Sequence, residues 1–130
     1  MVLNNLKDAQ RDLENLERFV GSEFQSYGDL AKAPLNKVIV GNGFTKEKIY
    51  EDSCKMSFKY VIQPNIELPF NWHNCLEIAT TNKGLLQEVV SGEVVEVGKA
   101  VNIKKGNVHS LKNIGTTELL VTATLFKDLK

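Results

Sequence analysis

The stretch NWHNCLE, residues 71–77, holds one of the two histidines of the chain, His73, four residues ahead of Glu77. Side chains alternate between the faces of a β-strand, so Asn71, His73, Cys75 and Glu77 share one face if the stretch is a single strand. Leaving a polar group buried without a partner costs about 1–3 kcal/mol, and a charge costs more. The stretch therefore predicts a site where these groups bind one another, a ligand or a divalent cation.

The chain after residue 34 has the pattern of short β-strands. Residues 54–62 alternate, and the predicted inward face consists of Cys54, Met56, Phe58, Tyr60 and Ile62. Other predicted elements are a short buried strand at 38–40, a turn at 41–43, a hairpin within 85–97 around Ser91-Gly92, and strands within 100–111 and 118–126. Short strands at near-regular spacing predict an antiparallel sandwich or barrel.

The histidine and glutamate of the opening stretch resemble the first of the two sequence motifs of the cupin superfamily. That motif runs Gly, five residues, His-x-His, three or four residues, Glu, six residues, Gly. The corresponding positions in this chain are Asn65, Asn71, His73, Glu77 and Gly84. Three of the five match the motif, and the two asparagines replace the first glycine and the first histidine.

The second histidine lies in a stretch that resembles the second cupin motif. That motif runs Gly, five residues, Pro-x-Gly, two residues, His, three residues, Asn. This chain has Gly98, Gly106, His109 and Asn113 at the matching spacing, and Lys104 stands in place of the proline. Both motifs occur in the expected order, so the resemblance is carried by two independent segments.

The resemblance covers about residues 60–126 and implies an all-β double-stranded β-helix, the cupin or jelly-roll barrel. It places His73, Glu77 and His109 at metal-ligand positions, with Asn71 where the family most often has its first histidine. Two imidazoles and a carboxylate suit one divalent ion such as Fe, Mn, Ni or Zn and leave coordination positions open. The amide oxygen of Asn71 is a candidate additional ligand.

Two more residues are candidates for contacting a ligand inside the barrel. Tyr60 ends the inward face of its strand and is placed to present a hydroxyl group. Cys75 lies on the predicted face of His73 and Glu77. For each residue the alternative is an ordinary core position, and the metal site itself has the alternative of a metal-free pocket.

The N-terminal residues have a different pattern. Apolar residues recur at helical spacing from Leu3 to Phe24, which predicts an amphipathic helix that Gly21 ends or interrupts. Residues 28–37 carry glycine, aspartate and proline and are expected to form a linker. The predicted organisation is a helical arm at 1–33 followed by a cupin barrel at 34–130. Trp72, on the face opposite His73, is expected to pack against the arm or a neighbouring subunit.

Size and charge exclude several function classes. At 130 residues the chain is one domain in length, and its 16 basic and 16 acidic residues cancel, which disfavours nucleic acid and anionic membranes as partners.

Without a long apolar run or signal segment the chain is expected to be cytoplasmic. Two cysteines outside any Cys-x-x-Cys pair predict free thiols. Exposed strand edges favour a homodimer.

The sequence leaves more than one function open. The first is a metal-dependent enzyme that acts on a small organic substrate, with dioxygenase, isomerase and lyase chemistry not separated. The second is a binding module for a sugar or organic acid, because NWHNCLEI also resembles the sensor arm of arabinose-type regulators. A structural subunit that assembles through its helical arm is the third.

Overall fold

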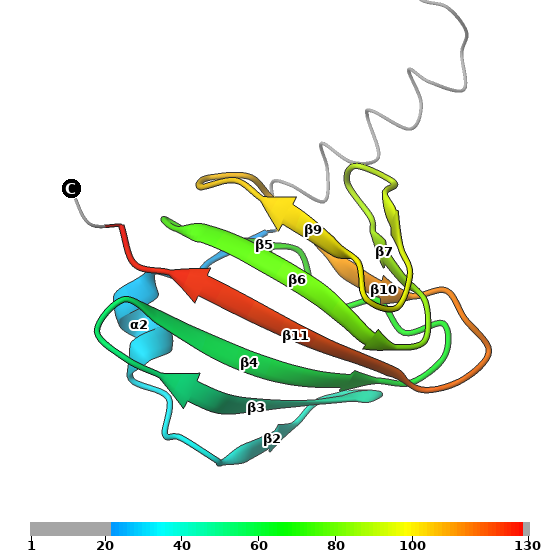
Figure 1. Ribbon diagram of the computed structural model, residues 1–130, viewed down its shortest axis with the longest axis horizontal. Helices are drawn as coiled ribbons and strands as arrows, with labels where there is room; N and C mark the ends of the chain where they lie inside the picture. The colour runs from blue at the N-terminus through cyan, green and yellow to red at the C-terminus, as the bar shows by residue number, and fades with distance from the viewer. Residues whose placement is uncertain (1–21, 129–130) are drawn as a thin grey trace, which may run out of the picture.

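The computed structural model describes residues 22–128, which form two facing β-layers (Figure 1). The larger sheet has six strands, in the spatial order β2 (Val38–Val40), β3 (Phe44–Glu51), β4 (Lys55–Ile62), β11 (Leu119–Phe126), β6 (Leu76–Lys83) and β9 (Ala100–Ile103). All of its neighbouring strands are antiparallel. Such a layout confirms the predicted antiparallel β-architecture.

The second layer is smaller and lies behind the large sheet in Figure 1. It contains an antiparallel sheet of β10 (Leu111–Asn113), β7 (Leu86–Glu88) and β8 (Val94–Val95). Next to it, β1 (Glu23–Phe24) pairs in parallel with β5 (Asn71–Trp72). The β7–β8 hairpin turns through Ser91 and Gly92, and the Gly92 φ of 76° is one that glycine adopts without strain. The predicted hairpin is confirmed.

The core lies between the two layers and follows from strand alternation. Every second residue of β11 is buried, beginning at Leu119, and the alternate residues are partly exposed. Two apolar clusters result. The larger includes Ile62, Leu86, Val95, Leu111 and Val121, and the smaller consists of Leu30, Met56, Phe58, Cys75 and Leu125. Tyr60, which is partly buried, packs against both clusters.

The buried asparagine of the second motif has a structural role. Its amide nitrogen donates to the carbonyl oxygens of Ile62 at 2.8 Å and Thr117 at 2.9 Å, and its side-chain oxygen accepts from the Gly115 amide at 2.9 Å. Asn113 thereby ties the turn before β11 to the end of β4. In the first motif Asn65 has a φ of 65°, the left-handed region that glycine favours and asparagine tolerates, which explains why it can stand at the glycine position.

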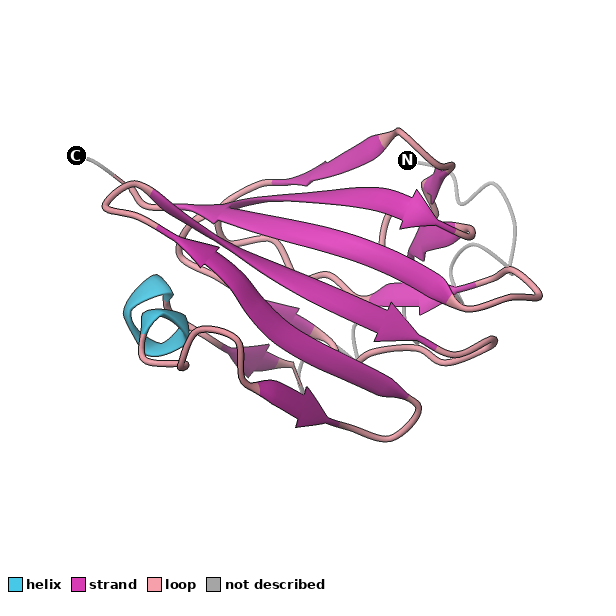
Figure 2. Cartoon of the chain, turned by 60° about the horizontal axis from the view of Figure 1, so that its bottom comes forward, coloured by secondary structure: helices cyan, strands magenta, loops and turns pink. Residues whose placement is uncertain are grey.

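The N-terminal predictions need correction where they overlap the described residues. Most of the helix predicted from Leu3 to Phe24 falls at residues 1–21, outside the described residues. Its last residue, Phe24, belongs to β1 instead. The predicted linker contains a short helix, α2 (Tyr27–Ala31), because the Ser26 hydroxyl accepts from the Asp29 amide and caps it. Figure 2 shows α2 at one end of the strands. The domain boundary at residue 33 stays a prediction, although β1 and α2 both pack on the barrel.

Three strand predictions also differ from the structure. The strand at 38–40 forms but is exposed, because it is the edge of the large sheet; Val40 is 77% exposed. Cys54 is exposed because the carboxylate of Asp52 accepts from the Cys54 and Lys55 amides and holds a turn before β4. The single strand predicted at 70–79 is interrupted after Trp72 and resumes at Leu76. The Gly106 amide donates to the His73 carbonyl at 2.8 Å, which replaces the expected strand pairing.

Candidate metal centre

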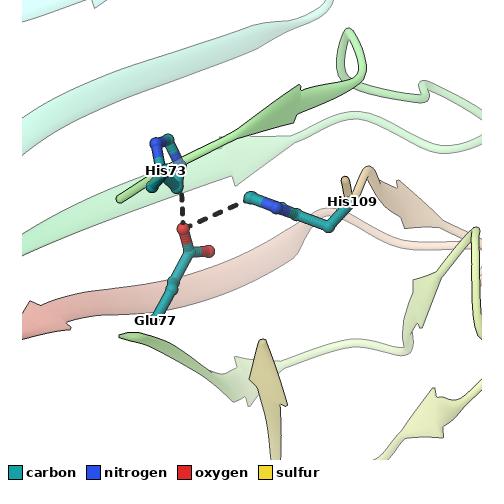
Figure 3. Close-up of side chains that lie close together, drawn as sticks. All are labelled: His73, Glu77 and His109. Carbon is teal, nitrogen blue, oxygen red and sulfur yellow. Dashed lines mark ion pairs between the residues drawn. The ribbon is translucent and has the colours of Figure 1, made fainter. Parts of the chain in front are cut away.

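The candidate metal ligands His73, Glu77 and His109 come from opposite layers of the barrel. Glu77 is the second residue of the long strand β6, while His73 lies in the loop before it. His109 pairs with Asn71 in an antiparallel bridge with backbone hydrogen bonds of 2.9 and 3.1 Å. Figure 3 shows the three side chains converging from these elements. Chain closure therefore brings both histidines, 36 positions apart in the sequence, to one carboxylate.

All three side chains are buried and close together. Glu77 Oε1 is 3.2 Å from His73 Nε2 and 3.4 Å from His109 Nε2. One ligand atom from each residue lies within 4.8 Å of the others, and no other group of His, Cys, Asp or Glu meets this criterion among residues 22–128. Each residue is at most 6% exposed. Such a group is compatible with a single bound cation.

The outer nitrogen of each imidazole faces a backbone carbonyl. His73 Nδ1 is 2.8 Å from the Gln25 oxygen and His109 Nδ1 is 3.3 Å from the Asn107 oxygen. A carbonyl oxygen only accepts, so it favours the tautomer with the proton on Nδ1 and the lone pair on Nε2. Two Nε2 lone pairs then face one carboxylate oxygen, which is repulsive unless protons or a metal ion lie between them. This is the arrangement of metal-binding histidines, whose second nitrogen is usually hydrogen-bonded.

Without a metal, protons must supply the missing positive charge. Burial by itself would raise the pKa of Glu77, but hydrogen bonds and charge from His109 and His73 outweigh burial and lower that pKa to about 2. Burial opposes the charged form of His109, yet the hydrogen bond and charge of Glu77 raise its pKa above the ordinary value. The carboxylate is thus ionised and ready to bind a cation at any pH near neutrality.

Asn71 brings a further polar group to the same cavity. Its Oδ1 is buried and, among the described residues, has no hydrogen-bond partner. The residue lines the same cavity as the triad His73, Glu77 and His109, a space of about 20 Å³ that we call the triad cavity. An unsatisfied buried oxygen costs about 1–3 kcal/mol, which a cation or a water at this position would remove. The His73, Glu77 and His109 side chains therefore fit a metal ion, and the Asn71 amide oxygen is a candidate additional donor at the same cavity.

The two predicted ligand-contacting residues have different surroundings. Tyr60 lines the triad cavity, and burial together with the Glu77 carboxylate raises the pKa of its hydroxyl, which stays protonated. Cys75 packs in the smaller apolar cluster and does not line that cavity. Burial raises the pKa of its thiol to about 11. Strand alternation failed for Cys75 because the loop at residues 73–75 turns its side chain away.

Sequence reasoning missed one residue that positions the site and one lysine that lies next to Tyr60. Gln25 orients His73 through its backbone carbonyl, which no side-chain pattern reveals. Lys46 lies on the inward face of β3, opposite Tyr60 in the register of β3 and β4. The signal for Lys46 was available, since Phe44, Lys46 and Lys48 alternate at strand spacing.

A larger pocket of about 470 Å³ adjoins the centre at His109, which lines both spaces. Its walls come from β9, from the loop before β10 and from the β7–β8 hairpin, and include Glu93, Asn102 and Asn107. The triad cavity alone has room for an ion or a water, whereas the larger pocket can hold a small organic molecule.

Comparison with solved structures identifies the fold. A Cupin_2 domain of an XRE family transcriptional regulator from Enterobacter cloacae aligns with a TM-score of 0.60 and 13% identity, covering 67% of this chain and 99% of that one. An RmlC-like cupin from Shewanella frigidimarina gives 0.61 at 14% identity, covering 73% and 86%. KdgF from Halomonas sp. gives 0.60 at 9% identity, covering 72% and 88%. No family model and no curated protein matches the chain.

The chain therefore has the jelly-roll fold of cupin domains, as its two motifs predicted. At these low identities the likeness concerns the fold alone. Its cavity carries a His-Glu-His group that could hold a metal ion. None of the helices within residues 22–128 has the length and apolar character needed to cross a membrane.

Proposed function

We propose that this cupin-fold domain binds one divalent metal ion through His73, Glu77 and His109, with Asn71 as a fourth donor, and acts on a small organic substrate. The observation that carries the proposal is the pair of imidazole Nε2 atoms aimed at one buried carboxylate oxygen while both Nδ1 atoms face backbone carbonyls. Only a positive charge between these atoms makes the arrangement favourable.

When bound, such an ion polarises an oxygen atom of the substrate as a Lewis acid, and two imidazoles with one carboxylate suit Fe, Mn, Ni or Zn. The chain's own groups do the rest. The carbonyls of Gln25 and Asn107 hold the rings in place, and the apolar residues around the cavity exclude bulk water. The protonated Tyr60 hydroxyl is a hydrogen-bond donor at the cavity wall. Dioxygenase, isomerase and lyase chemistry remain alternatives within this proposal.

Metal analysis of the protein purified without a His tag tests the proposal. We expect close to one divalent ion per chain, lost in His73→Ala and in His109→Ala and retained in Glu93→Gln, which removes an exposed carboxylate of the adjoining pocket. Thermal unfolding of each variant checks that it folds. A wild-type protein that binds no divalent metal when supplied with Fe(II), Mn(II), Ni(II) or Zn(II) would refute the metal function.

The second candidate is a non-catalytic module that binds a sugar or an organic acid. It is favoured by the structural likeness to the cupin domain of the Enterobacter regulator and by the roomy pocket beside His109. Ligand binding by a metal-free wild-type protein, without turnover of the ligand, would support this candidate over the first.

We also propose that the protein is a homodimer that pairs through β2. Val38, Ile39 and Val40 are all exposed on this edge strand, whose outer backbone groups face no strand within the described residues. An exposed apolar edge is a template for another strand, and a second copy of β2 pairs with it by symmetry. The cytoplasmic location stays a prediction.

A further inference from the structure

The larger pocket beside His109 combines an apolar wall with acidic side chains. Its volume of about 470 Å³ can hold a small organic molecule. Val101 and Ile103, both buried on β9, form part of the apolar wall together with Val90 and Val108. Within residues 22–128, neither a lysine nor an arginine lines the pocket. The polar and charged residues that line it are Glu88, Ser91, Glu93, Asn102, Asn107 and His109.

Glu88 places a negative charge in the pocket wall, although the residue is only 4% exposed. Its two carboxylate oxygens accept three backbone hydrogen bonds, from Val90 at 3.0 Å, Ser91 at 2.9 Å and Ser110 at 3.0 Å. A carboxyl group that only accepts hydrogen bonds is in its ionised form. Among the described residues no cationic side chain forms an ion pair with it. The backbone groups carry no net charge, so a cation in the pocket would still be attracted to this carboxylate.

Glu93 adds a second carboxylate from the β7–β8 hairpin. The residue is exposed, and its backbone amide donates to the Ser91 hydroxyl at 3.2 Å. In the described part of the chain its carboxylate has neither a hydrogen-bond donor nor a cationic partner. A divalent ion held by Glu77 and two neutral imidazoles would leave one positive charge at the metal centre. The two carboxylates of the pocket outweigh that charge, so the pocket attracts cations.

The lining also separates one kind of organic cation from another. Quaternary ammonium groups carry no N–H group and are recognised by the faces of aromatic rings. No phenylalanine, tyrosine or tryptophan of residues 22–128 lines this pocket. A primary ammonium group instead donates several hydrogen bonds, and the carboxylate of Glu93 and the side-chain oxygens of Asn102 and Asn107 are acceptors in the lining.

We propose that this pocket binds a small primary amine. Glu93 holds the ammonium group, the charge of Glu88 adds to the attraction, and Val101 and Ile103 contact the aliphatic part of the molecule. The inference rests on the proposed function in placing a small organic ligand beside the metal centre, and it names the class of that ligand as organic cations rather than organic acids. Amine binding itself does not need the ion, because neither carboxylate belongs to the metal-ligand group.

The test uses hexylamine, hexan-1-ol and hexanoate, which share an alkyl chain and differ in charge, and tetramethylammonium as a quaternary cation. Each is titrated into the nitrogen-15-labelled full chain, both with Zn(II) and after chelation, and followed by NMR. The local signals are the side-chain amides of Asn102 and Asn107 and the backbone amide of Gly106, which all line the pocket. The variants are Glu93→Gln and Glu93→Lys. The matched control is Glu96→Gln, which removes an exposed carboxylate that does not line the pocket. Metal content and melting temperature are measured on the same samples.

We expect hexylamine to bind with a dissociation constant of about 1 mM. Hexan-1-ol should bind about 3-fold and hexanoate at least about 10-fold more weakly. Glu93→Gln should weaken hexylamine binding about 3- to 10-fold and Glu93→Lys more than about 10-fold, with hexan-1-ol affinity, metal content and melting temperature unchanged. The Glu96→Gln protein should behave as wild type.

Several results would overturn the inference. One is hexanoate binding as tightly as hexylamine, and another is a wild type in which about 10 mM hexylamine shifts none of the local signals. Equal hexylamine affinity in wild type and Glu93→Gln would overturn it as well. Tighter binding of tetramethylammonium than of hexylamine would contradict recognition of a primary ammonium group.

The two proposals fail in different ways. A wild type that binds no metal, yet binds hexylamine in a Glu93-dependent manner, refutes the metal function and supports the amine pocket. A wild type with one metal per chain and a preference for hexanoate refutes the inference and leaves the metal function intact.

Discussion

Acid should destabilise the metal-free protein through Glu77. The pKa of this carboxyl is lowered from 4.5 to about 2 in the folded state. A depressed pKa contributes stability that is complete above the unfolded value and is lost as the pH falls through the folded value. The depression corresponds to about 3 kcal/mol, of which roughly 2 kcal/mol disappears between pH 6 and pH 3. His109 acts in the opposite sense, because its raised pKa stabilises below about 6.5 and is lost at higher pH.

The assay has a global and a local part, both on chelated protein. Urea unfolding at pH 3 and pH 6 gives the total change in free energy, to which other carboxyls also contribute. Carbon-13 NMR of the Glu77 side-chain carboxyl isolates the one residue by measuring its pKa in the folded protein. A Glu77 that titrates at or above pH 4.5 would show that the imidazoles do not carry positive charge toward it, and the electrostatic description of the centre would be wrong.

Three further predictions follow from named contacts. Asn113→Ala should destabilise the protein by about 3 kcal/mol in urea unfolding, because it removes three hydrogen bonds, one buried and two partly buried; a loss below 1 kcal/mol would contradict their importance. Asn71→Ala should weaken metal affinity about 10-fold in a competition titration and leave the stability of the chelated protein equal or higher, since an unsatisfied oxygen is removed; unchanged affinity would exclude the amide as a ligand. Ile39→Lys should convert the dimer to a monomer in light scattering, and a wild-type monomer would refute pairing through β2.

The fold was predictable because its constraints are local and periodic. Alternation along 55–62 and 119–126 reports burial directly, and the motif spacing around His109 and Asn113 fixes the turns. What alternation could not report is position within a sheet. The Val38–Val40 strand reads as buried because its residues are apolar, yet only the pairing order makes it an edge.

The candidate site was predictable in its side chains but not in its supports. His73, Glu77 and His109 are brought together as the motif spacing implied. Their backbone partners carry no residue-type signal, because any residue at position 25 offers the same carbonyl. Cys75 shows where strand alternation fails. The strand is interrupted between Trp72 and Leu76, where the Gly106 amide donates to the His73 carbonyl. The Cys75 side chain packs in the smaller apolar cluster and does not line the triad cavity.

The carbonyl of Gln25 fixes one imidazole from outside the barrel proper. The ring of Phe24 packs against that of Trp72 at a tilt of 40°, with centroids 4.3 Å apart, and this contact holds the segment beside the cavity. It is the contact with the N-terminal arm that was expected of Trp72. A shortened version of the protein beginning at residue 34 would keep His73, Glu77 and His109 and still lose the Gln25 carbonyl that orients His73. We therefore expect a lower metal affinity for this shortened protein than for the 130-residue chain.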